Sequence, residues 1–166
     1  MIDEVVAYVR GEVRDWLEVA DSEVIADGAR ALSSRDIAPG ARITLLSAEP
    51  EAHYGSPELT SRRRQDAQTL VRLNLLLLIS FEFESYETSL RHLSNTIRLF
   101  YERPVLSADH ASSTNPFPAD LGSLRVTQLS VGADFAALRN LWAAMGAPHS
   151  PSAVLRIEGL ELQRTP

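Results

Sequence analysis

The chain has 166 residues, which suits one domain with a buried core, because folding at this length removes roughly 70% of the unfolded chain's surface. It contains no cysteine, which excludes thiol catalysis, thiolate zinc sites and a disulfide framework, and fits a reducing compartment. Its 22 acidic and 16 basic residues give a net charge of −6, so we expect no nucleic-acid partner. Every basic residue is arginine.

We expect no membrane partner and no secretion signal. The amino terminus, Met1 to Glu4, is acidic and lacks the basic segment and apolar stretch of a signal peptide. The longest apolar run, Leu75 to Ile79, is far shorter than the ~20 residues that a membrane-spanning helix needs. The sequence therefore predicts synthesis and assembly in the cytoplasm.

The first half of the chain predicts one helix, one clear strand and a long loop. Apolar residues recur with the period of a single helix face over residues 1–20, and a short strand is possible at Glu23 to Ala26 within an otherwise irregular stretch. A strand starts at Ala41, where β-branched and apolar residues follow Gly40. From Pro50 to Asp66, proline, glycine and serine without a regular period predict a long loop.

The second half begins with an alternating apolar pattern that predicts a long strand from Thr69 to Phe83. Its middle is apolar on both faces, which is typical of a strand covered on both sides. After Tyr86 the period becomes helical and Pro104 ends the helix. The remaining predictions are an irregular connection at 107–122, a strand at 124–131, a helix at 135–145 and a last strand at 153–162.

These elements predict an α+β fold in a single domain over residues 1–166. We expect a mixed or largely antiparallel sheet of about four strands packed with three main helices. Irregular loops are expected at about 50–68 and 107–122, and no internal repeat divides the chain.

Motifs that would indicate an enzyme are missing. The phosphate-binding pattern Gly-x-x-x-x-Gly-Lys is impossible without lysine, and no Gly-x-Ser-x-Gly sequence occurs. Of the four histidines, His53 has two carboxylates close before it in sequence, Glu49 and Glu51, and a solvated loop explains that cluster more simply than a metal or acid–base site. His92 lies between apolar helix positions and is predicted to be structural. We expect no cofactor, no metal and no catalytic residue.

Two features are candidates for contacts with other proteins. Arg62, Arg63 and Arg64 form a local basic patch in the loop, which is either simply solvated or docks on an acidic partner. Phe100 and Tyr101 are adjacent on one helix, so both cannot face inward, and Tyr101 is the candidate for an exposed contact.

Three stretches together resemble a known protein family. They are the helix that opens with Met1 to Val5, the strand and helix from Leu73 to Leu106, and the Trp142 helix with the strand that follows it, Leu138 to Ile157. In sequence, order and spacing they are similar to the tail terminator, or cap, proteins of extracellular contractile injection systems, phage-tail-like particles of the antifeeding-prophage and virulence-cassette type. The family commonly has glutamine where this chain has Tyr101 or Glu102, and Ala41 to Ala67 matches only loosely.

The resemblance implies a structural subunit without an active site. It implies a homo-hexameric ring that caps the distal end of the inner tube and sheath, ends polymerisation and fixes the length of a particle that is later released. Arg62 to Arg64 are then hypothesised to dock on a neighbouring subunit, tube or sheath. Two alternatives stay open: a connector or baseplate adaptor of the same particle, and a small ligand-binding or enzymatic domain with a dispersed site.

Overall fold

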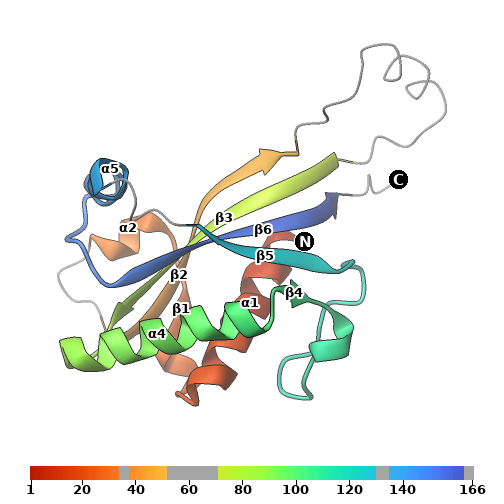
Figure 1. Ribbon diagram of the computed structural model, residues 1–166, viewed down its shortest axis with the longest axis horizontal. Helices are drawn as coiled ribbons and strands as arrows, with labels where there is room; N and C mark the ends of the chain where they lie inside the picture. Colours follow the sequence, from red (N-terminus) through yellow and green to blue (C-terminus); the bar gives the residue numbers. More distant parts are fainter. Residues whose placement is uncertain (34–37, 52–70, 130–134, 163–166) are drawn as a thin grey trace, which may run out of the picture.

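In the computed structural model the chain is described over residues 1–33, 38–51, 71–129 and 135–162 (Figure 1). The helices are α1 (Ile2–Leu17), α2 (Ala29–Leu32), α4 (Tyr86–Glu102) and α5 (Phe135–Met145), with 3₁₀ turns η1 (Asp21–Glu23) and η2 (Ala108–His110). The strands are β1 (Val24–Ala26), β2 (Gly40–Pro50), β3 (Val71–Glu82), β4 (Val105–Leu106), β5 (Leu124–Leu129) and β6 (Ser152–Leu162).

The strands form one sheet in the order β1-β2-β3-β6-β5-β4. Only β1 and β2 run parallel, and the other pairs are antiparallel. The long strand β3 lies between β2 and β6 and pairs with β6 from Val71 opposite Leu162 to Ser80 opposite Ser152. The two outermost strands are the shortest, with three residues in β1 and two in β4.

One face of the sheet carries the larger part of the core. Helices α1 and α4 cover this face, and β3 turns Leu75, Leu77, Ile79 and Phe81 toward them, all fully buried (Figure 1). Because side chains alternate along a strand, these four residues share one face. The helices contribute the other side of the core with Val5, Val9, Val13, Leu99 and Phe100.

A smaller apolar cluster lies on the opposite face. Leu78 of β3 and Val154 of β6 pack there with Leu32 of α2 and Trp142 of α5. The middle of β3 is therefore covered on both sides, as its two apolar faces predict. Trp142 is 3% exposed and belongs to this core.

The structure confirms the α+β class and the mixed sheet but corrects the number of strands. The described residues form six strands where about four were expected, because the possible strand at 23–26 is real and β4 adds a further pair. β2 also runs on to Pro50, and a single helical turn, α2, lies inside a stretch predicted to be loop. Elements of two to four residues show no period, so pairing in the folded sheet, and not local pattern, creates them. Most of the loop predicted at 50–68 lies outside the described residues.

The irregular connection predicted at 107–122 is confirmed as mostly non-regular, yet it is anchored along α1. The buried side chain of Asn115 donates hydrogen bonds to the Tyr8 carbonyl and to Glu12 Oε1, both at 3.1 Å. The Phe117 ring meets the Tyr8 ring edge-on at 4.9 Å between centroids. These contacts fix the segment against the helix, so it is less adaptable than its composition indicates.

Candidate interaction surfaces

The outer face of α4 is the most apolar exposed surface that the structure describes. Seven large apolar side chains of the described residues are exposed, and five of them lie on α4 or three residues beyond its end. Tyr101 is 85% exposed and Tyr86 is 70% exposed. We name these five residues the α4 stripe: Tyr86, Leu90, Ile97, Tyr101 and Val105.

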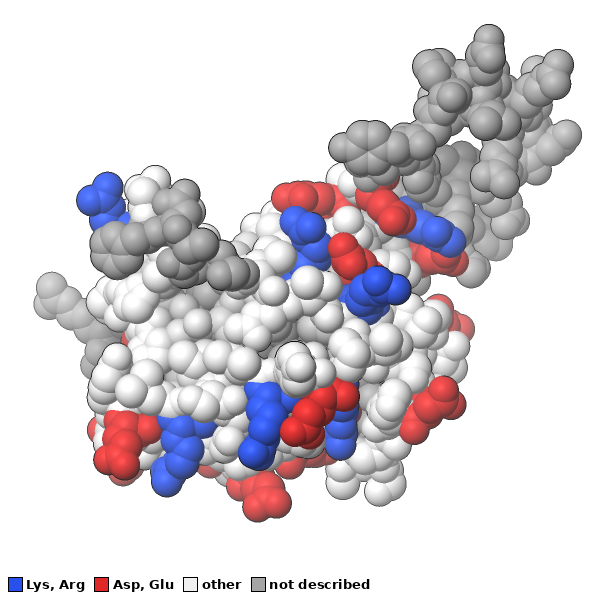
Figure 2. Space-filling model, viewed as in Figure 1, with Lys and Arg blue, Asp and Glu red and all other residues white. Residues whose placement is uncertain are grey.

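Helical spacing places the α4 stripe along one side of the helix. The four helical members are separated by four, seven and four residues, which brings them to neighbouring positions around a 3.6-residue turn. Charged residues occupy the adjoining exposed positions, in the order Glu87, Arg91, Arg98 and Glu102. Figure 2 shows both acidic and basic side chains along the lower rim of the molecule, where α4 lies.

Of the adjacent residues Phe100 and Tyr101, one is buried and the other is exposed, as expected from their positions on the helix. Phe100 is 4% exposed and packs in the core, whereas Tyr101 points outward. On the exposed side of this helix end, Arg98 pairs with Glu102 at 3.8 Å, and such an exposed ion pair contributes little stability. The α4 stripe therefore contains, in Tyr101, a large aromatic side chain that the fold itself leaves exposed.

A buried polar network holds α4 in place behind the stripe. Glu12 is 5% exposed, and its carboxylate accepts hydrogen bonds from Arg103 and Asn115, each at 3.1 Å. The Arg103 guanidinium also lies over the Trp16 ring, 5.2 Å from its centroid. A buried carboxylate is tolerated when charge and hydrogen bonds compensate it, as they do here. The network joins α1, α4 and the connection after η2.

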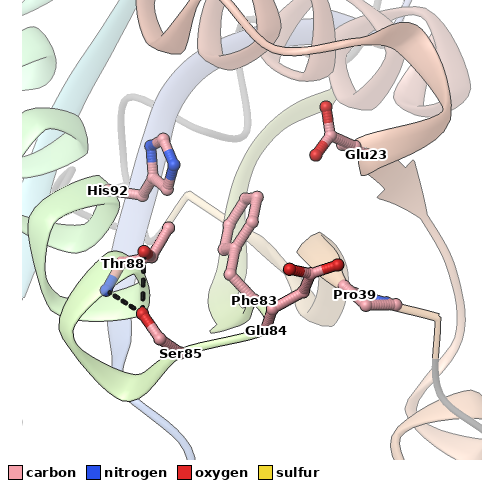
Figure 3. Close-up of a pocket in the computed structure, with 7 residues that line it drawn as sticks. All are labelled: Glu23, Pro39, Phe83, Glu84, Ser85, Thr88 and His92. Carbon is pink, nitrogen blue, oxygen red and sulfur yellow. Dashed lines mark hydrogen bonds between the residues drawn. The ribbon is translucent and has the colours of Figure 1, made fainter.

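A pocket of about 280 Å³ opens at the amino-terminal end of α4 (Figure 3). Glu23 and Glu84 stand on one side of the Phe83 ring, and His92 lies on the other. The His92 and Phe83 rings are 4.3 Å apart between centroids. Burial, helped by the nearby Arg91 charge, lowers the pKa of His92 below its usual 6.5, so the ring is neutral near pH 7.

This pocket contains serine, histidine and glutamate but not in a catalytic arrangement. Ser85 is the N-cap of α4: its Oγ accepts a hydrogen bond from the Thr88 N–H at 3.0 Å and donates to Thr88 Oγ1 at 2.8 Å. His92 Nδ1 is buried without a hydrogen-bond partner in the described structure. A nucleophile needs a base within hydrogen-bond reach, and Ser85 has none here.

A second, more apolar pocket of about 460 Å³ lies beside α5. Its lining combines the buried Trp142 with the exposed Arg139, Ala143 and His149. Gly146, in the left-handed conformation at φ 66°, ends α5 and lets the chain turn back. The His149 ring meets the Trp142 ring at 64°, 5.6 Å between centroids.

Comparison with known proteins identifies the family. The family model of the Pvc16 N-terminal domain matches residues 4–165, nearly the whole chain. The chain belongs to the Pvc16 N-terminal domain family. The resemblance inferred from the three sequence stretches is thereby confirmed at the level of the family.

A solved structure has the same fold as this Pvc16 N-terminal domain. It is described as an extracellular contractile injection system, the PVC sheath/tube terminator in the extended state, determined by cryo-electron microscopy. The TM-score is 0.65 at 12% sequence identity, and the match covers 100% of this chain and 57% of the other. The chain thus spans little more than half the length of that terminator. No curated protein matches the sequence significantly.

The sites predicted from sequence are placed only in part. Tyr101 is exposed, and His92, which was predicted to be structural, is partly buried. Arg62, Arg63, Arg64 and His53 lie outside the described residues. Within residues 1–33, 38–51, 71–129 and 135–162, no three His, Cys, Asp or Glu side chains gather as a metal site, and no helix is long and apolar enough to span a membrane.

The other members of the α4 stripe and the α5 pocket were not predicted from sequence. Leu90 and Ile97 have the helical period of core residues, and only the packing of α4 shows that they lie at the edge of its buried face. The members of the α5 pocket come from both sides of Gly146, so no spacing within one element could have indicated it. The one feature of the sequence that indicates the α4 stripe is that α4 carries more apolar residues than its buried face needs.

Proposed function

We propose that this chain is a tail terminator subunit of a contractile, phage-tail-like injection particle. In this role it caps the distal end of the inner tube and sheath, stops their polymerisation and so fixes the particle's length. The observation that carries the proposal is the likeness of the whole described chain to a sheath/tube terminator, together with membership of the Pvc16 N-terminal domain family.

The role requires contact surfaces and no active site. A closed ring with head-to-tail contacts needs two different, complementary surfaces on each subunit, besides the face that meets the tube or sheath. We assign the α4 stripe to one of these contacts, because a row of exposed apolar side chains on a rigid helix is typical of a protein interface. Tyr101, the most exposed of them, is its expected anchor.

The ring is proposed to be a homo-hexamer that forms in the cytoplasm and leaves the cell with the particle. Arg62, Arg63 and Arg64 are proposed to dock on acidic groups of a neighbouring subunit, tube or sheath. Replacing all three with alanine should then weaken binding to assembled tube and sheath, and more so at low salt than at high salt. Binding by the variant as tight as that of the wild type, at both low and high salt, would remove this part of the proposal.

Deletion of the gene in the producing cell tests the main proposal. Without a terminator, tube and sheath should grow to uneven lengths or fail to persist, and electron microscopy of purified particles measures this directly. Particles of normal, uniform length would overturn the proposal. Labelled protein seen at the end opposite the baseplate would support it, whereas label at the baseplate would assign the chain to a connecting role.

A further inference from the structure

The α5 pocket is mostly apolar, and one of its lining residues, the buried Trp142, has an indole N–H without a hydrogen-bond partner in the described part of the chain. Trp142 is 3% exposed, and its indole N–H has no hydrogen-bond acceptor among the described residues. Buried tryptophan N–H groups usually find an acceptor, because an unmade hydrogen bond in the interior is unfavourable. The fold's own core explains the ring but not this missing bond.

Size and lining indicate what could occupy the pocket. About 460 Å³ lies within the roughly 300–1,000 Å³ that is common for ligand sites. Leu138, Ala143 and Ala147 supply apolar surface, and Arg139 is an exposed cation among the lining residues that forms no ion pair with any described residue. An apolar group that brings an oxygen acceptor, with a negative charge next to it, would complement all of these features.

We propose that the α5 pocket binds a segment of a partner polypeptide, in which an apolar side chain is followed by an acidic residue. The apolar side chain fills the pocket, a main-chain carbonyl accepts the Trp142 N–H, and the carboxylate pairs with Arg139. The N–H is shielded from water, so this bond requires a small shift of the lining side chains. The choice of a polypeptide, and not another apolar acid, rests on the proposed function, since a terminator works through protein contacts.

Proton NMR of the indole N–H groups tests the proposal, because the chain has only two tryptophans and Trp16 serves as the internal reference. The probe is the blocked dipeptide N-acetyl-Leu-Glu-amide, with N-acetyl-Ser-Glu-amide and N-acetyl-Leu-Lys-amide as matched controls. We expect the Trp142 signal alone to move downfield and saturate, with a dissociation constant on the order of 1 mM. Both controls should bind several-fold more weakly.

Substitutions separate the parts of the site. Ala143→Glu places a charge in the pocket and should abolish binding, whereas Ala144→Glu, also exposed on α5 but not lining the pocket, should leave it unchanged. Trp142→Phe keeps an apolar ring without the donor and should weaken binding roughly three- to tenfold. For this variant, binding is measured from the NMR signals of the peptide itself. Arg139→Gln should remove the preference for the acidic peptide over the basic one.

Several results would overturn the proposal. They are no saturable shift of the Trp142 signal, equal shifts with the serine control, or equal loss of binding in the Ala143 and Ala144 variants. None of these results depends on particle length, so their failure to support peptide binding leaves the proposed terminator role standing. Conversely, normal-length particles after gene deletion would leave the measurement of peptide binding valid.

Discussion

Gly11 lies where α1 passes directly against the Asn115 side chain, and a methyl group there has no room. A Cβ at this position would stand 2.2 Å from Asn115 Oδ1. Asn115 would have to move and give up its bonds to Tyr8 and Glu12, which outweighs the gain of about 1 kcal/mol that alanine brings to a helix. We expect Gly11→Ala to lower the free energy of unfolding by about 1–3 kcal/mol in urea titrations.

Gly28→Ala is the matched control for this substitution. A Cβ at Gly28 meets no atom within 4 Å, so the free energy of unfolding should change by less than about 0.5 kcal/mol. A Gly11→Ala variant as stable as the wild type would show that Asn115 does not need its present position.

His92 should make the protein less stable as the pH falls below neutral. Burial lowers its pKa in the folded state, so above 6.5 the ring is neutral in both states and contributes nothing to the pH dependence. Below 6.5 the unfolded chain binds a proton that the folded chain does not, and stability falls until the pH reaches the folded pKa. Arg91 adds to the shift and Glu23 opposes it, without reversing its direction.

The measurement is the free energy of unfolding between pH 7 and pH 5. His92→Asn should lose less stability over this range than the wild type, because it removes the group whose pKa is lowered in the folded state. Parallel curves for the wild type and His92→Asn would contradict the prediction.

At the scale of elements, α4 begins at a well-defined cap. Ser85 Oγ accepts the Thr88 N–H at 3.0 Å, and removing such an N-cap typically costs about 1 kcal/mol. We therefore expect Ser85→Ala to lower the free energy of unfolding by about 1 kcal/mol. Ser94→Ala, on the exposed side of the same helix, should be neutral or slightly stabilising, because Ser94 only bonds back to the Leu90 carbonyl. Thermal denaturation of the two variants side by side measures the difference.

The main elements could be predicted from sequence because each carries its own periodic signal. The alternation around Leu77 and the helical spacing after Tyr86 extend over a dozen residues or more, long enough to separate strand from helix. β4 has two residues and α2 has four, and both depend on what they pair with or pack against.

Contacts between distant residues escaped prediction for a related reason. Asn115 and Tyr8 are 107 positions apart, and nothing in the sequence of either segment indicates a contact with the other. The exposure of Tyr101 was predictable because Phe100 is its neighbour and only one of the two could face inward. Trp142 was predictable as core, but not the pocket beside it, which forms only when α5 and the turn after Gly146 are in place.

At the scale of the whole molecule, the α4 stripe should matter for assembly and not for folding. Tyr86 and Tyr101 are largely exposed, so the double substitution Tyr86→Ser with Tyr101→Ser should change the free energy of unfolding by less than about 1 kcal/mol. Under the proposed function it should reduce incorporation into particles by tenfold or more, since buried aromatic anchors dominate interfaces. Immunoblotting of purified particles measures incorporation.

Thr127→Ala is the control, because Thr127 is exposed on β5, away from the α4 stripe. It should enter particles as the wild type does. Normal incorporation of the double tyrosine variant would show that the α4 stripe is not a contact in the particle.

The central place of β6 has a consequence for how the protein is made. This strand is the last described element along the chain, yet it lies between β3 and β5 and is the only strand that joins the two halves of the sheet. While the ribosome is still translating β6, the earlier strands cannot close into the final sheet. Pairing over such long sequence separations is slow, typically milliseconds to seconds. A nascent chain that stops short of residue 152 lacks the strand that joins β3 to β5, so the complete sheet forms only after β6 has been translated.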